Sequence, residues 1–145
     1  MTKTLKNTFN PGNYPKNIDF MLILLRITVG VFMLSHGIGK FTTLFGGEPI
    51  QFPDPIGVGA SASLALTVFA EVLCSILLIF GLATRFAAVS LLITMLVAAI
   101  IVHATDGFGK QELPLLYALV YFVIAIAGAG KISIDNWIFN SINNK

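Results

Sequence analysis

Four stretches of mainly apolar residues, separated by shorter polar or glycine- and proline-containing segments, dominate the chain. They cover residues 18–39, 58–82, 86–103 and 113–129. Each is close to the roughly 20 apolar residues that an α-helix needs to cross the hydrocarbon core of a bilayer. Only a few residues around Ala83–Arg85 separate the second and third stretches, so we expect these two helices to be antiparallel neighbours. The pattern predicts an all-α integral membrane protein, an antiparallel four-helix bundle over residues 18–130.

The segments outside the predicted bundle differ in character. Residues 1–17 are polar and predict a cytoplasmic tail, and no cleavage-site pattern follows the first span, which is therefore expected to be a retained anchor. The longest loop, 41–57, contains three prolines, which oppose a continuous helix. Pro114 is expected in the first turn of the fourth span. In the tail 131–145, a tryptophan between apolar residues favours an interfacial segment.

Composition narrows the function classes. The 145 residues are 56% hydrophobic and 11% charged, with a mean hydropathy of +0.86, whereas a soluble domain carries about 25% charge. A soluble domain and a disordered chain are both excluded. The net charge of +2 is too small to favour nucleic acid. The single cysteine, Cys74, excludes an internal disulfide relay. No room is left for a soluble catalytic domain, so a soluble redox partner would be a separate chain.

The distribution of lysine and arginine predicts the orientation. An even number of spans places both termini on one side of the membrane. That side carries Lys3, Lys6, Lys16, Arg85, Lys131 and Lys145. The opposite side carries Lys40 and Lys110. The positive-inside rule therefore predicts a multi-pass protein of the bacterial inner membrane with both termini in the cytoplasm.

Arg26 and Glu71 are ionisable residues inside apolar runs. Such a group costs about 2.5–3.5 kcal/mol at the centre of a membrane helix, so it normally has a partner or a task. At 1.5 Å per residue they lie roughly 12 and 15 Å from the cytoplasmic ends of their helices, which allows a salt bridge. The pair could fix helix register, could also line a ligand or proton site, or the two residues could make no contact. Gly30 and Gly37 follow Arg26 at helical spacing and favour close packing of a neighbouring helix.

A second group of polar residues gathers toward the outer ends of the spans. His36 and Lys40 share a helix face, and His103 ends the third span at the same level. Tyr121 lies deeper, and its hydroxyl needs a partner. The histidines are either ordinary interfacial residues or part of a shared proton or ligand site; haem ligation is disfavoured, and no metal-ligand cluster or catalytic residue is assigned. The candidate ligand or proton site comprises Arg26, His36, Lys40, Glu71, His103 and Tyr121.

Several short segments, in order, carry a family resemblance. They are Arg26-Ile-Thr-Val-Gly30, His36-Gly-Ile-Gly-Lys40-Phe41, Glu71, Gly81-Leu-Ala-Thr-Arg85 and Gly128-Ala-Gly-Lys-Ile-Ser-Ile-Asp135. Over nearly the whole chain from Ile18, this pattern resembles the DoxX family of small four-span bacterial membrane proteins, in the wider DoxX/DoxD/MauE-like group. The resemblance implies a four-helix bundle in the inner membrane. Some members of the group resemble membrane subunits of quinone-linked oxidoreductases, and others resemble partners in thiol or oxidative-stress complexes. The shared polar residues would be Arg26, His36, Lys40 and Glu71.

Three functions remain open. In the first, the chain is the membrane subunit of a quinone-linked redox complex with a soluble or membrane redox partner. Arg26 would then hold a quinone carbonyl, Glu71 would orient Arg26 or relay a proton, and His36 would exchange protons with the outer face. In the second, the chain is a non-enzymatic scaffold that binds a soluble partner through its longest loop. In the third, a homo-oligomer transports an ion or small molecule.

Overall fold

The computed structural model describes residues 10–143, and within that range the chain forms helices and no strand. The elements are α2 (Lys16–Phe45), α3 (Ala60–Val68), the π-helix η1 (Phe69–Cys74), α4 (Ser75–Phe80), α5 (Thr84–Val97), the π-helix η2 (Ala98–Val102), α6 (Phe108–Ala127) and α7 (Ile134–Asn143). Four helical stretches are long and apolar enough to cross a membrane: Lys16–Phe45, Ala60–Phe80, Thr84–Val102 and Phe108–Ala127. The predicted all-α membrane bundle is confirmed. Of the predicted tails, residues 1–9 and 144–145 lie outside the described residues.

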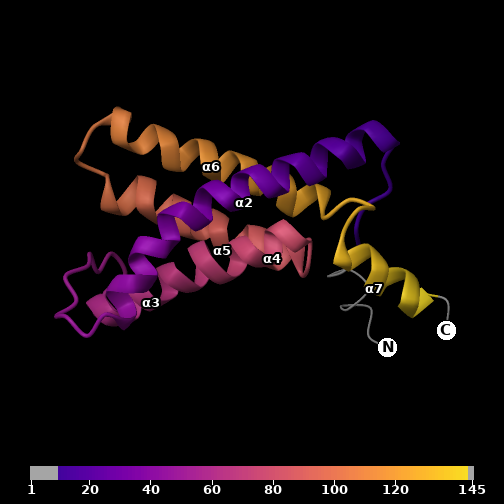
Figure 1. Ribbon diagram of the computed structural model, residues 1–145. Helices are drawn as coiled ribbons and strands as arrows, with labels where there is room; N and C mark the ends of the chain where they lie inside the picture. Colours follow the sequence, from indigo (N-terminus) through magenta and orange to yellow (C-terminus); the bar gives the residue numbers. More distant parts are fainter. Residues whose placement is uncertain (1–9, 144–145) are drawn as a thin grey trace.

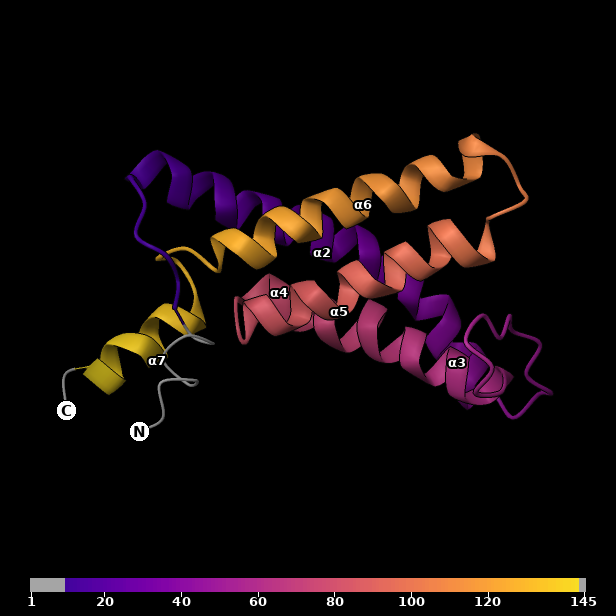
Figure 2. The ribbon, with the colours of Figure 1, turned by 180° about the vertical axis from the view of Figure 1, so that it is seen from behind.

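The helices pack along α5 on two sides, and α2 crosses them. Figures 1 and 2 show α5 running beside α4 and diverging from α3 toward one end, with α6 packed along α5 and α2 crossing the bundle obliquely. The beginning of α2, the end of α6 and α7 lie at one end of the molecule (Figure 1). We call this the terminal end, and the opposite end, with residues 46–59 and 103–107, the loop end. Successive spans therefore alternate in direction.

Two helix boundaries differ from those expected from the sequence. The first helix continues to Phe45, so Phe41 and Phe45 belong to α2, where their rings contact each other at 4.7 Å between centroids and are tilted by 48°. The prediction that Pro114 lies in the first turn is wrong, because α6 begins at Phe108 and contains Pro114 in its interior. A proline there has no N–H to donate to the Lys110 carbonyl four residues earlier, which leaves a local weakness in the α6 backbone.

Small residues set the spacing between α2 and the second span. A Cβ added at Gly30 would lie 2.6 Å from Ile79 Cγ1, and one added at Gly37 would lie 2.8 Å from Val72 Cγ2. The close approach expected at these glycines is therefore present. Close backbone contact supplies the van der Waals packing that holds membrane helices together where hydrophobic driving force is weak. It also fixes which residues of α2 face η1 and α4.

Candidate functional site

A polar cavity of about 190 Å³ opens between the helices near the loop end. It is lined by Met33, His36, Lys40, Glu71, Met95, Ala98, His103, Leu113, Pro114 and Tyr117. Four of the six residues predicted as a ligand or proton site meet there: His36 and Lys40 from the first span, Glu71 from the second, and His103, which directly follows the third. Because these residues are far apart in the sequence, only the folded bundle creates this site, which we call the polar cavity.

An ion pair forms one wall of the polar cavity. The Lys40 ammonium donates to both Glu71 carboxylate oxygens, at 2.5 and 2.7 Å. The Glu71 side chain is 3% exposed, whereas that of Lys40 is 33% exposed. A bidentate contact of this kind is charge-assisted and stronger than a neutral hydrogen bond. Two of the three ammonium protons are used by Glu71, so the third is available to a ligand.

The expected salt bridge between Arg26 and Glu71 is not formed. Gly37 packs against Glu71, while Arg26 lies beside Gly81. Eleven residues of α2, roughly 16 Å, separate these two levels. The predicted depths of Arg26 and Glu71 were each counted from the cytoplasmic end of their own helix. These two ends are not level, because α2 begins about ten residues before it reaches Gly81, which follows the end of α4. The two counts therefore did not align the helices.

Both π-helices found within residues 10–143 lie at the polar cavity. Glu71 is within η1, and Ala98 of η2 lines the cavity wall just before His103. A π-helical turn widens the backbone and changes the direction of the side chains that follow, and such turns are frequent at functional sites. The two segments thus aim Glu71 and His103 into the same space from neighbouring spans, an arrangement that no periodicity in the sequence revealed.

His103 is held by a carboxylate at the rim of the polar cavity. Its Nδ1 lies 2.8 Å from Asp106 Oδ2, and Lys110 Nζ is 3.7 Å from the same oxygen. The hydrogen bond from His103, followed by the charge of Lys110, lowers the pKa of Asp106 below its ordinary value. An ionised Asp106 only accepts, so Nδ1 carries the proton and Nε2 is left to exchange one. Gln111 braces this turn by donating to the His103 carbonyl at 2.9 Å.

Aromatic side chains continue from the polar cavity into the core. The His36 ring meets the edge of Tyr117 at 6.2 Å between centroids, and Tyr117 stacks on Tyr121 at 6.1 Å. Tyr121 is fully buried and does not line the cavity, so this predicted site residue lies behind the site. Its hydroxyl has no hydrogen-bond partner within residues 10–143. A buried hydroxyl without a partner is costly, and this one marks a position where a polar ligand atom or a proton path would be stabilised.

Arg26 holds the terminal end together and does not line the polar cavity. It is 1% exposed, and its guanidinium donates to the Ile132 carbonyl at 2.7 Å and the Leu78 carbonyl at 3.4 Å. Gly81 has φ +67°, and a Cβ there would overlap the Arg26 guanidinium. Gly81, the first residue of the Gly81–Arg85 segment that resembles the family pattern, is therefore accounted for by its packing against Arg26.

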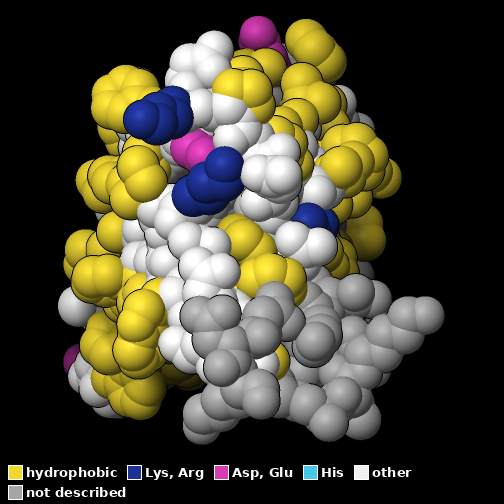
Figure 3. Space-filling model, turned by 90° about the vertical axis from the view of Figure 1, so that its right-hand side faces the viewer, with side chains coloured by type: hydrophobic (Ala, Val, Ile, Leu, Met, Phe, Trp, Pro, Cys, Tyr) yellow, Lys and Arg dark blue, Asp and Glu magenta, His cyan; other side chains and the backbone are white. Residues whose placement is uncertain are grey.

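Two buried aspartates at the terminal end were missed by the sequence analysis. Asp135 accepts from the backbone N–H groups of Ala83 and Thr84 at 2.7 and 2.9 Å, and so caps the start of α5. Asp19 accepts from the Lys131 N–H at 2.9 Å. Figure 3 looks onto this end, where basic side chains surround a carboxylate in the described part of the surface. Asp19 stands at the edge of the first predicted span and Asp135 in the segment predicted to be interfacial, and neither position indicated burial by tertiary contacts.

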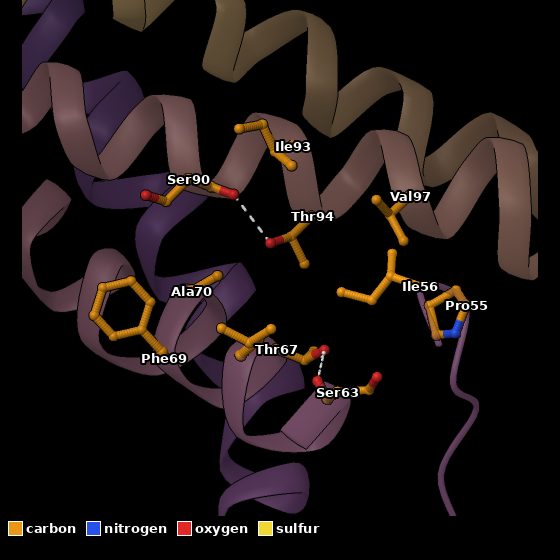
Figure 4. A pocket seen from close by; sticks show the side chains of 11 residues that line it. Pro55, Ile56, Ser63, Thr67, Phe69, Ala70, Ser90, Ile93, Thr94 and Val97 are labelled. Carbon is orange, nitrogen blue, oxygen red and sulfur yellow. Dashed lines mark hydrogen bonds between the residues drawn. The ribbon is translucent and has the colours of Figure 1, made fainter. Parts of the chain in front are cut away.

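A second cavity, of about 250 Å³, lies between α3, η1 and α5 near the loop end (Figure 4). Its four hydroxyls come from Ser63, Thr67, Ser90 and Thr94. Each already donates: Ser63 to Asp54 at 2.7 Å, and the others to the carbonyl four residues earlier at 2.8–3.0 Å. With their donors used and the rest of the lining apolar, these hydroxyls suit lipid contact better than recognition of a polar ligand.

The fold and the polar cavity together define a four-span membrane protein with a charged site between its helices. The DoxX family model matches residues 21–104. An uncharacterised Haemophilus influenzae protein is 33% identical over 136 residues, covering 88% of this chain and 98% of the relative. The chain belongs to the DoxX family.

Other relatives of this chain have similar coverage. A Bacillus subtilis protein named "Putative oxidoreductase CatD" is 29% identical over 130 residues, covering 89% of this chain and 95% of that protein. An uncharacterised membrane protein of Mycobacterium tuberculosis is 30% identical over 139 residues, covering 79% and 78%. No solved structure matches the chain significantly.

Proposed function

We propose that this protein is the membrane subunit of a redox complex and that its polar cavity binds the head group of a quinone. The observation that carries this proposal is the Lys40–Glu71 ion pair, which lies on the wall of an interhelical cavity that also contains two histidines. An intramembrane ion pair beside a cavity is a candidate functional site. The name of the Bacillus subtilis relative as an oxidoreductase agrees with this class.

The residues present fit a quinone ring. A quinone offers two carbonyl oxygens, which only accept hydrogen bonds, and the polar cavity offers donors from Lys40, His36 and Tyr117. The remaining ammonium proton of Lys40 would bind one carbonyl. Reduction to the quinol takes two electrons, supplied by a partner redox protein, and two protons. His103, held by Asp106 at the rim, is placed to pass protons to the ring.

The charge distribution supports an orientation in the bacterial inner membrane. Within residues 10–143, the terminal end carries Lys16, Arg85 and Lys131 outside the hydrophobic core, and the loop end carries Lys40 and Lys110. The positive-inside rule then places the terminal end in the cytoplasm. The polar cavity would face the outer leaflet, and a redox partner would approach from that side.

Calorimetric titration of the detergent-solubilised protein with two tailless quinones, duroquinone and dimethylnaphthoquinone, tests this function. We expect at least one of them to bind the wild type. Loss of a hydrogen bond to a charged donor costs about 1.5–3 kcal/mol, so Lys40→Met should weaken binding at least tenfold. His36→Leu should also weaken binding, although less.

A matched control comes from the second cavity. Ser90→Ala removes a hydroxyl that lines that cavity and should leave quinone affinity unchanged. If neither quinone binds the wild type, or if binding is equal in wild type, Lys40→Met and His36→Leu, the proposed site is wrong. A stoichiometric protein partner captured without any quinone would then favour the scaffold function.

A further inference from the structure

We infer that a groove between α2 and α6 binds the isoprenoid tail of the quinone whose ring lies in the polar cavity. This inference rests on the proposed function and adds to it the class of quinone: one with a long apolar chain. It also assigns a second binding surface, on a face of the molecule that the ion pair does not reach.

The first part of the groove is continuous with the polar cavity. It is an apolar cavity of about 270 Å³ between the middle of α2 and the first half of α6. Its lining is Leu25, Thr28, Val29, Phe32, Leu113, Leu116, Tyr117 and Val120. Leu113 and Tyr117 line both this cavity and the polar cavity. The two cavities therefore adjoin at Leu113 and Tyr117, and a ligand that occupied both would cross beside the Tyr117 ring.

The second part extends toward the terminal end. A further apolar cavity, of about 470 Å³, is lined by Leu25 and Thr28 again and continues along α2 to Ile18 and across to Val123 on α6. The polar cavity and the groove together follow α2 from His36 to Ile18, a span of eighteen residues or roughly 27 Å. This is close to the thickness of the hydrocarbon core, about 30 Å. The groove thus offers a path for a long chain at membrane depth.

The groove exists because α2 and α6 contact each other little. Helix α6 packs along α5, and α2 packs on α3, η1 and α4, held there by Gly30 and Gly37. In Figures 1 and 2, α2 crosses α6 obliquely instead of running beside it. Side chains on both walls face outward, including Thr28, Phe32 and Leu116. The bilayer can therefore supply a ligand sideways, without passage through water.

The shape and polarity of the polar cavity and the groove, taken together, select the type of molecule that can occupy both. A phospholipid acyl chain would fill the apolar part alone, because its head group must stay at the bilayer surface. A polyprenyl quinone has an apolar chain attached directly to a flat ring with two acceptor oxygens. Only this second type of molecule uses both the donors of the polar cavity and the groove. We therefore commit to a quinone tail as the occupant.

The experiment compares quinones with and without a tail on the same protein variants. Duroquinone and a decyl-substituted trimethylbenzoquinone form one pair, and the corresponding methyl- and decyl-naphthoquinones form another. Because a decyl chain also partitions into detergent micelles, the quantity compared is the ratio of the two affinities in each variant. The variants that fill the groove are Thr28→Trp on α2 and Leu116→Trp on α6. The matched control is Ile27→Trp, an outward-facing residue of α2 that lines none of the four cavities described above.

We expect the decyl quinone to bind wild type and Ile27→Trp at least tenfold more tightly than the tailless quinone. In Thr28→Trp and Leu116→Trp this gain should be lost while tailless binding is unchanged. The tail site is overturned, and the ring site stands, if the tailless quinones bind but the decyl quinone binds wild type no more tightly. The same conclusion follows if the tighter binding of the decyl quinone persists in both groove variants. Loss of the gain on adding excess phospholipid would also overturn the tail site, since the groove would then be a lipid site. Failure of both quinones to bind wild type would instead reject the proposed function.

Discussion

At the scale of single residues, the two partners of the ion pair differ in exposure. Glu71 is almost fully buried, whereas a third of the Lys40 side chain is accessible. A lysine that loses its partner can extend its long side chain toward the membrane surface. A glutamate in η1 has no such freedom and must either stay charged in an apolar environment or take up a proton. Stability should therefore depend on the two residues unequally.

Lys40→Met should destabilise the protein by up to about 3–5 kcal/mol, the cost of leaving one buried charge without its partner. Glu71→Gln should cost clearly less, since Lys40 can reorient. The double variant should be more stable than Lys40→Met alone, because it leaves no unpaired charge. Thermal unfolding in detergent measures all three variants. Equal losses from the two single variants, or additive losses in the double variant, would contradict the pairing described here.

Asp106 should make stability depend on pH in the acid range. Its hydrogen bond from His103 and the nearby Lys110 charge lower its folded-state pKa. Its stabilising contribution is therefore complete above the unfolded value of about 3.9 and is lost as the pH falls through the lower folded value. Asp106→Asn should flatten this part of the curve of thermal midpoint against pH. Glu112→Gln, on the same end of α6, serves as the control. If the thermal midpoints of wild type and Asp106→Asn fall in the same way as the pH is lowered, the contact between Asp106 and His103 is refuted.

At this scale the sequence predicted the members of the site better than their contacts. Helical spacing placed His36 and Lys40 on one face, and span direction placed His103 at the same level, as the polar cavity confirms. The partner of Glu71 was wrong because pairing depends on helix register. Register is decided by where Gly37 lets α2 approach η1, and hydropathy does not encode that contact.

At the scale of secondary-structure elements, two glycines of α2 have opposite surroundings. A Cβ at Gly37 would lie 2.8–3.0 Å from Val72 and Glu71, whereas a Cβ at Gly39 would meet nothing within 4 Å. Gly37 therefore sets the distance between α2 and η1, and with it the reach of Lys40, one turn further along. Gly39 carries only the entropic cost of glycine in a helix.

Gly37→Ala should destabilise the protein by about 1–3 kcal/mol through overpacking and should weaken quinone binding by moving Lys40 away from Glu71. Gly39→Ala should be neutral or stabilise by up to about 1 kcal/mol. Thermal unfolding and duroquinone titration of both variants measure these effects. A stable Gly37→Ala protein with normal quinone affinity would show that this close approach does not position the site.

The elements themselves were predictable to different degrees. Four apolar runs of spanning length identified the spans. The π-helical turns were not predictable, because their residues have ordinary helix-forming composition and only tertiary packing selects the wider hydrogen-bond pattern. The interior position of Pro114 shows the same limit. The sequence predicted a loop before residue 113 because residues 109–112 are mostly polar, whereas α6 already begins at Phe108.

At the scale of the whole molecule, the terminal end and the loop end are built differently. Arg26, Asp135 and Asp19 join the ends of the spans and the C-terminal segment into one structural unit. The polar cavity lies toward the loop end, and the groove runs along α2 toward the terminal end on the face open to the bilayer. The groove could not be predicted from the sequence, since it results from two helices failing to pack, and each has an ordinary apolar face.

Photolabelling with a ring-azido quinone, followed by mass spectrometric mapping of the adducts, tests quinone binding in the polar cavity most directly. The label reports where the ring lies in the intact protein and requires no substitution. We predict adducts on residues of the polar cavity, led by His36, His103 and Tyr117, that excess duroquinone prevents. Adducts centred instead on Ile56 and Ile93 of the second cavity, or labelling that duroquinone does not displace, would contradict a quinone site beside Lys40 and Glu71.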